Sequence, residues 1–509
     1  MRTKSSLINL SFALSGQLVG LLVSFFARIV FIQVLGAEYL GLTGLFTNIL
    51  SILALVEMGI GPAIAFSLYK PLAEKDVEKT KGLMKLYQKA YISIGLVIII
   101  LGMIITPLLE MVIKSIPDIP HIHIIFMLFV INTATTYFYS YKRTLIIADQ
   151  KRYIATIYRY SFFIVLNIIQ IILLLLTHNF ILFLICQFIA TLTENVLVSK
   201  RAEQLYPYLK EKKTQKVDKL TLAEISRNVR AMIAHKLGAV VVNSTDSLII
   251  SKFVGLVQVG LYSNYQLIVN ALNIITGQVF SSITAGIGNL GATEAYDKKR
   301  FIFNVVFFIN FWIYGFITIC LVVLFNPFVE LWVGKDYIIS TSTVSFIILN
   351  FYLSGMRKGV LTFREALGVY WYDRHKPIFE SVINLIASLF LVHQLGMVGV
   401  FIGTTISTLT TCFWVEPYVL YKYALKSSVT QFFVRYTLYT LITILTGFIT
   451  LELTNYFNEV NLQTFIIQLF ICLTIPNLVF LILFYRTKEF KYLHKVLKNF
   501  IFLKKSNRN

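Results

Sequence analysis

A single arginine, Arg28, lies inside a long apolar run near the start of the chain. Ionisable side chains are costly inside a membrane, and where they occur they commonly serve binding or transport. The run ends at a turn that begins at Gly36, and a second apolar run follows as far as a glycine-rich break at Gly59. Because this turn is short, the two runs predict a hairpin of membrane-spanning helices that carries a guanidinium group in its first helix.

Two further polar residues precede Arg28 on the same predicted helix. Gln17 and Ser24 lie eleven and four residues before Arg28, so that in a helix all three share one face. A polar face on a membrane helix is expected to contact protein or a water-filled cavity rather than acyl chains. Gln17, Ser24 and Arg28 are therefore candidate substrate-binding residues.

An acidic residue occurs at a matching place in the second half of the chain. Asp246 lies nine residues before Gly255, and Arg28 lies eight residues before Gly36. At a rise of 1.5 Å per residue, each group would be roughly 12–14 Å below the external surface. Two interpretations stay open: Arg28 and Asp246 form a buried salt bridge between two lobes, or they line a cavity and pair in only one state.

The run that follows Gly255 carries a polar stripe at helical spacing, which includes the candidate binding residues Asn270 and Asn273. The whole stripe is Gln266, Asn270, Asn273, Gly277 and Ser281. Amides and hydroxyls on one face suit sugar hydroxyls, and hydrogen bonding between neighbouring helices is the equally good alternative.

Several charged residues are predicted near the inner ends of spans. His235 and Lys236 are candidates for positive charge at the inner mouth of a pathway, although long basic side chains also snorkel to the interface for no functional reason. Arg357 and Arg364 would add to this charge, with solvated loop residues as the simpler interpretation. Glu416 lies near a span end, where a carboxylate is inexpensive, and no role is predicted for it.

The composition indicates a membrane protein. Of the 509 residues, 57% are hydrophobic and only 14% are charged, whereas about a quarter of the residues in soluble chains are charged. Apolar runs of membrane-spanning length predict an all-α polytopic protein with about fourteen transmembrane helices. The predicted spans are 7–34, 39–67, 86–108, 121–141, 160–177, 180–199, 231–251, 259–289, 301–326, 341–361, 378–395, 397–416, 431–452 and 463–485.

The net charge of +21 would suggest a nucleic-acid partner in a soluble chain. Here nearly all lysines and arginines fall in alternate connections, which the positive-inside rule assigns to the cytosol. The pattern predicts cytosolic N- and C-termini and no nucleic acid. Basic amphipathic segments at Lys70–Lys89 and from Arg486 onward predict contact with anionic membrane lipids.

Two echoes in the sequence suggest that the chain is built from parallel repeats of six spans. Gly36 and Gly41 are matched by Gly255 and Gly260, and a later Asp149–Arg152 segment is matched by Asp373–Pro377. Such repeats commonly place a substrate site at their interface. The expected organisation is an N-terminal lobe (1–199), a cytosolic linker (200–230), a C-terminal lobe (231–425), two further spans (426–485) and a basic cytosolic tail (486–509).

Signatures of catalysis are missing from the sequence. No His/Cys spacing typical of a metal site, no nucleophile elbow and no phosphate-binding loop of the Walker type occurs. The four cysteines are scattered singly through apolar runs, as buried small hydrophobes would be. We expect a protein that is not an enzyme and needs neither metal nor cofactor.

By these motifs the chain resembles oligosaccharide flippases of the Wzx type, within the superfamily of multidrug, oligosaccharidyl-lipid and polysaccharide exporters. The resemblance covers essentially the whole chain. It is carried by Arg28 with the Leu35–Leu42 turn, and by Gly368 with Asp373–Pro377. The second motif continues through Asn384-Leu385 into the segment Leu395–Thr404.

The resemblance implies a V-shaped pair of six-helix lobes and alternating access. It also implies export of polyprenyl-pyrophosphate-linked oligosaccharide units across the bacterial cytoplasmic membrane, for cell-surface polysaccharide such as a capsule, with polysaccharide polymerase machinery as a candidate partner. A multidrug exporter of similar architecture is the main alternative. A membrane polysaccharide polymerase is a weaker one, because no predicted external connection exceeds about fifteen residues.

Overall fold

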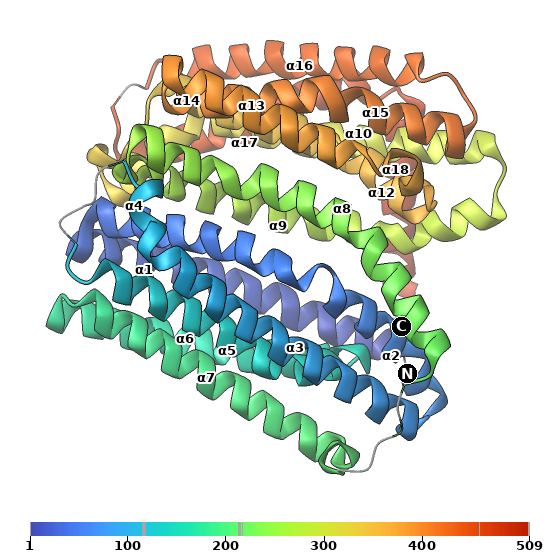
Figure 1. The fold of residues 1–509 in the computed structure, drawn as a ribbon. Coiled ribbons are helices and arrows are strands. Elements are labelled where there is room, and N and C mark those ends of the chain that lie inside the picture. Colours follow the sequence, from blue (N-terminus) through green and yellow to red (C-terminus); the bar gives the residue numbers. More distant parts are fainter. Residues whose placement is uncertain (1, 115–118, 212–214, 216, 458, 507–509) are drawn as a thin grey trace. The chain divides into compact units, whose positions relative to one another are not determined.

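A computed structural model describes residues 2–114, 119–211, 215, 217–457 and 459–506. The described chain is helical and contains no β-strand (Figure 1). By its internal contacts it divides into two compact units, Met1–Ser263 and Asn264–Asn509. The boundary between them falls within one helix, and the lobe and linker limits expected from the sequence remain predictions.

The first unit contains α1 to α8 and the start of α9. Its elements are α1 (Arg2–Leu53), η1 (Ala54–Glu57), α2 (Ile60–Glu74), α3 (Val77–Ile105), η2 (Thr106–Leu108), α4 (Leu109–Val112), α5 (Ile122–Ala148), α6 (Arg152–Thr177), α7 (Phe180–Leu205), η3 (Pro207–Lys210), α8 (Lys219–Ile249), the π-helical η4 (Ile250–Val254) and α9 (Leu256–Thr293).

The second unit contains the greater part of α9 and all later elements. These are α10 (Tyr296–Val333), η5 (Lys335–Tyr337), α11 (Thr341–Met356), α12 (Lys358–Ala366), η6 (Val369–Asp373), α13 (Lys376–Leu395), α14 (Met397–Ser407), the π-helical η7 (Thr408–Cys412), α15 (Phe413–Val419), the π-helical η8 (Leu420–Leu425), α16 (Thr430–Thr454), α17 (Leu462–Phe484) and α18 (Lys488–Ser506).

Helices of the first unit pack along their lengths. The pair α3 and α5, the pair α5 and α7, and the pair α1 and α6 lie side by side (Figure 1). At the centre, the fully buried ring of Phe46 on α1 meets Phe126 and Phe129 of α5 edge-on, with centroids 4.9 and 5.7 Å apart. Edge-to-face aromatic pairs of this kind add to the stability that burial already supplies.

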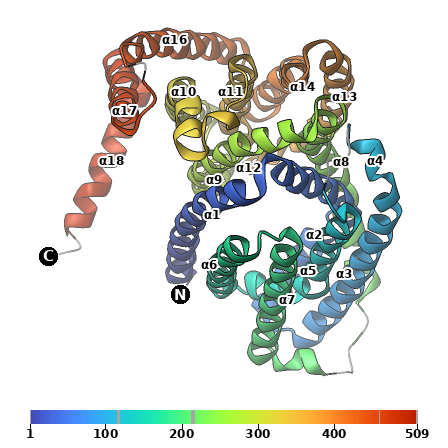
Figure 2. The same ribbon diagram turned by 90° about the vertical axis from the view of Figure 1, so that its left-hand side faces the viewer.

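In the second unit α10 lies against α11, α16 and α17 (Figure 2). The ring of Phe311 on α10 stacks on Tyr439 of α16 with centroids 4.3 Å apart and also contacts Phe480 of α17 at 4.8 Å. This aromatic cluster joins both C-terminal membrane helices, α16 and α17, to α10.

The all-α membrane class is confirmed. In the part of the chain that the structure describes, eleven helices are long and apolar enough to cross a membrane. The first of them, Ser15–Glu57, covers two of the predicted spans. The predicted span 341–361 is represented by α11, which has 16 residues, and the predicted span 231–251 lies in α8, where many side chains are not described. These three differences explain why the sequence predicted about fourteen spans and the structure has eleven such helices among the described residues.

The helical conformation is interrupted at both glycine turns that the sequence predicted. Gly36 interrupts α1 with non-helical dihedral angles, at φ 83°, and Gly255 has φ 140° between η4 and α9. Such angles favour glycine, because a side chain would be strained there. The start of α1 and α2 lie at the same end of the first unit, as a hairpin with its turn at Gly36 requires (Figure 1).

The basic segment Lys70–Lys89 is not one surface helix. It is interrupted at Lys75, which has a positive φ of 58°, and α3 begins at Val77 with Asp76 as its N-cap. Leu83 and Met84 are buried in the first turns of α3. Their burial makes this half of the segment the entry to a membrane helix rather than a separate amphipathic helix.

Candidate functional site

Arg28 is half-buried and lies on the part of α1 that precedes Gly36. Arg28 Nη1 donates a hydrogen bond to Ser263 Oγ at 2.9 Å, and Ser263 Oγ donates to the carbonyl oxygen of Gly260 at 2.7 Å. Within the described residues no carboxylate forms an ion pair with Arg28. The guanidinium therefore keeps donor groups that a multivalent anion could use.

Ser24 and Gln17, the other two residues of this face, form no hydrogen bond to Ser263 or Arg28 in the described part of the chain. Ser24 Oγ donates to the carbonyl oxygen of Gly20 within the same helix at 2.8 Å, and Gln17 is half-buried. A hydroxyl that donates to the preceding turn of its own helix needs no hydrogen-bond partner on another helix. Gln17 and Ser24 remain predicted binding residues, and neither is bonded to Arg28 in the described structure.

Asp246 is buried on α8, in the same unit as Arg28. Its Oδ1 atom has no hydrogen-bond partner, and no ion pair joins Asp246 to Arg28 among the described residues. Next to it, Ser247 Oγ accepts a hydrogen bond from Asn48 Nδ2 at 3.0 Å, which ties α8 to α1. Arg28 and Asp246 are therefore not paired in this structure, and both interpretations of the two residues remain predictions. A buried carboxylate oxygen without a hydrogen-bond partner is costly on an anion.

The remaining predicted residues are less informative. Asn270 and Asn273 belong to the second unit on α9, where Asn270 is exposed and Asn273 is half-buried. His235 and Lys236 lie on α8, but their side chains are outside the described residues. These four residues stay predictions.

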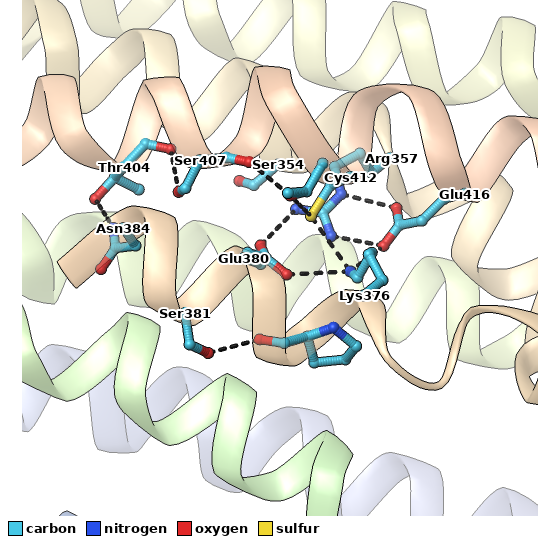
Figure 3. A network of polar contacts seen from close by, with 12 residues as sticks. Ser354, Arg357, Lys376, Glu380, Ser381, Asn384, Thr404, Ser407, Cys412 and Glu416 are labelled. Atoms are coloured by element: carbon cyan, nitrogen blue, oxygen red, sulfur yellow. Dashed lines mark hydrogen bonds and ion pairs between the residues drawn. The ribbon is translucent and has the colours of Figure 1, made fainter. Parts of the chain in front are cut away.

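The densest group of charges in the second unit centres on Glu416, for which the sequence suggested no role (Figure 3). The Glu416 side chain on α15 is fully buried. Arg357, at the end of α11, binds it through two hydrogen bonds, Nε to Oε2 at 2.9 Å and Nη2 to Oε1 at 2.7 Å. Lys376, at the start of α13, also donates to Oε1 at 2.7 Å. One carboxylate therefore joins three helices.

Three other charged groups complete this ion cluster. Glu380 Oε2 pairs with Lys376 at 3.1 Å, and Arg364 of α12 pairs with Asp373. The members are Arg357, Arg364 and Lys376 with Asp373, Glu380 and Glu416. The three cations and three carboxylates balance, so the ion cluster has no excess charge with which to recruit an anionic substrate. Its geometry fits a structural role in holding helix ends together.

The first unit has a similar ion pair between an arginine and a glutamate. Arg143 of α5 donates to Glu194 of α7 with Nη2 and Oε1 2.6 Å apart. In predicted span order this pair joins the fourth span to the sixth, and Arg357 with Glu416 joins the tenth span to the twelfth. The signal in the sequence was the position of each arginine, three residues after a serine (Ser140 or Ser354) near the end of its span, which identifies the arginine but not its partner.

Among the described residues, no group of three or more His, Cys, Asp or Glu side chains is placed to hold a metal ion. The four cysteines are free thiols.

Comparisons with known proteins give a fold rather than a family. No protein-family model matches the sequence, and no curated protein sequence matches it. Among solved structures, the lipid II flippase MurJ in an inward closed conformation aligns with a TM-score of 0.65 and 15% identity, over 94% of this chain and 99% of the flippase.

Multidrug transporters share the fold as well. An inward-facing multidrug resistance MATE family transporter of the MOP superfamily aligns with a TM-score of 0.62 and 16% identity, over 82% of this chain and 98% of that one. A mutant of the Vibrio cholerae MATE transporter VcmN aligns with a TM-score of 0.57 and 14% identity, over 84% of this chain and 99% of the transporter. The fold is thus one shared by a lipid II flippase and by MATE transporters, and the resemblance to Wzx-type flippases remains a prediction within it.

Proposed function

We propose that this protein is an alternating-access flippase. Its substrate would be a polyprenyl-pyrophosphate-linked oligosaccharide, carried from the inner to the outer face of the bacterial cytoplasmic membrane for cell-surface polysaccharide assembly. The observation that carries the proposal is Arg28, a half-buried guanidinium in a membrane helix with a neutral hydroxyl as its hydrogen-bond partner. Pyrophosphate is a multivalent anion, which guanidinium groups bind through charge-assisted and often bidentate hydrogen bonds.

Two further points support an anionic lipid substrate. The structural match to the lipid II flippase covers 94% of this chain, against 82% for the MATE transporter. Movement of negative charge outward is also favoured by an inside-negative potential, by about 2.3 kcal/mol per charge per 100 mV. In the proposed orientation both termini lie in the cytosol, which follows from the positive-inside pattern.

A multidrug exporter is the second candidate function, and one observation favours it. Asp246 is a buried carboxylate whose Oδ1 atom has no partner, which is the kind of group that a cationic substrate would bind. Under the flippase proposal the same carboxylate is free to take up a proton or a coupling cation.

Transport in proteoliposomes separates the two functions. The purified protein is reconstituted with a fluorescent polyprenyl-pyrophosphate saccharide in the inner leaflet, and exposure of the label is followed with a membrane-impermeant quencher. A parallel assay measures uptake of a cationic dye. We expect flipping of the saccharide lipid that increases with an inside-negative potential. Dye transport without any lipid flipping would refute the flippase proposal.

A further inference from the structure

A pocket of about 330 Å³ lies in the first unit beside the first turns of α3, the last turns of α5 and the short η3 helix. This volume is in the range of small-molecule sites. The lining residues are Lys81, Met84, Lys85, Gln88, Tyr141, Lys142, Tyr208, Leu209, Lys210 and Glu211. The positive-inside pattern places this end of the helices on the cytosolic side.

The lining is rich in basic side chains. Four lysines, which come from three separate elements, converge on the pocket. Three of these lysines pair with the carboxylates of Glu78, Glu203 and Glu211, so the group keeps one excess positive charge. Met84, Tyr141, Tyr208 and Leu209 supply apolar wall between them. A site of this kind suits an anion that carries several acceptor oxygens together with an uncharged portion.

Lys81 is the buried lysine of the pocket. Its side chain is 4% exposed, and its Nζ atom contacts Glu211 Oε2 at 2.6 Å and Glu78 Oε1 at 2.7 Å. The Glu211 side chain is 60% exposed, so it can be hydrated when it leaves Lys81, and Glu78 stays bonded to Lys81. Glu211 thus places an acidic group at the buried end of the pocket from a segment that lies at the surface.

Gln215 and Asp218, which lie between Glu211 and the body of α8, also contact α3. The backbone carbonyl oxygen of Gln215 lies 2.9 Å from the position that a Cβ atom on Gly82 would take, and Lys79 pairs with Asp218 at 3.7 Å. Release of Lys81 by Glu211 would therefore remove one of the contacts that Glu211, Gln215 and Asp218 make with α3.

We propose that this pocket binds a phosphate-bearing anion, and that the Glu211 carboxylate occupies the phosphate position at Lys81 when the anion is absent. Lysine ammonium groups bind phosphate as point charges, and basic pockets between helices at the cytosolic membrane surface bind phospholipid head groups. The phosphate belongs either to an anionic phospholipid of the inner leaflet or to a soluble phosphate compound. The inference does not depend on which substrate the protein transports.

The test compares two charge-matched double variants of the full-length protein. Lys85→Gln with Lys210→Gln removes two exposed lysines of the pocket and leaves the buried Lys81 in place. Lys70→Gln with Lys75→Gln removes two exposed lysines just before α3, outside the pocket. Native mass spectrometry counts phosphatidylglycerol retained from nanodiscs of phosphatidylglycerol and phosphatidylcholine, and equilibrium dialysis measures binding of inorganic pyrophosphate.

We expect the pocket variant to lose about thirtyfold in affinity for at least one of the two probes, because two lysines are removed and each lysine near the surface contributes about 1 kcal/mol to anion binding. The control variant should stay close to the wild type. Loss of phosphatidylglycerol alone identifies the source as lipid, and loss of pyrophosphate alone identifies a soluble ligand. Equal loss in both variants, or no loss in the pocket variant, would overturn the proposal.

A third variant tests the role of Glu211. Glu211→Gln removes the competing carboxylate and is expected to raise the affinity for the same probe, with faster amide exchange in residues 209–211 and 217. A lower affinity in Glu211→Gln would show that the carboxylate does not occupy the anion position.

Discussion

Gly41 and Gly260 pack against each other's helices at reciprocal positions. A Cβ atom on Gly41 would lie 2.0 Å from the carbonyl oxygen of Leu256, and one on Gly260 would lie 2.2 Å from the carbonyl oxygen of Ala37. Each glycine lies five residues after a glycine with non-helical dihedral angles: Gly41 follows Gly36, and Gly260 follows Gly255. The chain segments that follow the two turns therefore approach each other closely through their backbones, an arrangement that small residues permit between membrane helices.

This contact predicts that Gly41→Ala destabilises the protein. The added methyl group would meet a backbone atom, which cannot rotate away, so the two helices must separate. We expect a loss of about 1–3 kcal/mol, as for other overpacked positions, seen as a lower apparent melting temperature of the protein in detergent.

Gly44→Ala is the matched control on the same helix. A Cβ atom there would meet Val259 Cγ1 at 3.4 Å, an ordinary van der Waals distance. Its melting temperature is expected to stay close to that of the wild type. If Gly41→Ala and Gly44→Ala behave alike, the close approach of the two helices is not as described.

The sequence predicted these turns because glycine positions and apolar run lengths are local properties. It did not predict that Gly41 and Gly260 touch, since the echo indicates equivalence and not contact. The same limit applies to charges. Arg28 was recognisable as a costly residue within a span, but its hydrogen-bond partner Ser263 is 235 positions away, and only the packing of α1 against α9 brings the two together.

Glu416 shows the limit most clearly. A lone carboxylate near a span end is inexpensive in itself, so no local pattern indicated that it would need a partner. Its three cationic neighbours come from the ends of α11, α12 and α13, and they meet only after those helices have packed. Membrane class and turn positions could thus be predicted from local patterns, and the ion cluster could not.

The ion cluster predicts that Glu416→Gln is strongly destabilising. The substitution leaves Arg357, Lys376 and Arg364 with only two carboxylates in a buried setting, and loss of one partner of a buried pair costs about 3–5 kcal/mol. Chemical or thermal unfolding in detergent measures this loss. Glu365→Gln, an exposed position on α12, is the control, with an expected change within about 0.5 kcal/mol.

A double variant checks the cause. Arg357→Met combined with Glu416→Gln restores the balance at two cations and two carboxylates, and it should be less destabilised than Glu416→Gln alone. If the double variant loses as much stability as Arg357→Met and Glu416→Gln lose together as single variants, the two charges act independently.

Asp246→Asn separates the two interpretations of the buried carboxylate. In this structure Asp246 Oδ1 has no partner, so replacement by a neutral amide of the same shape should leave the melting temperature unchanged or raise it. Transport should fall if the carboxylate binds a proton, a coupling cation or a cationic substrate. A marked drop in melting temperature would instead indicate that Asp246 forms a structural salt bridge.

The proposed role of Arg28 predicts graded effects of two substitutions. Arg28→Ala removes the charge, and the loss of one charged hydrogen-bonding group, worth about 1.5–3 kcal/mol, should lower flipping of the pyrophosphate lipid at least about tenfold. Arg28→Lys keeps the charge but not the planar fork, so an intermediate rate is expected. Membrane insertion and melting temperature should change little, because Ser263 keeps its hydrogen bond to Gly260. Gln33→Ala, at an exposed position of the same helix, is the control for general effects on α1. If Arg28→Ala flips the lipid at the rate of the Gln33 variant, Arg28 does not bind the transported substrate.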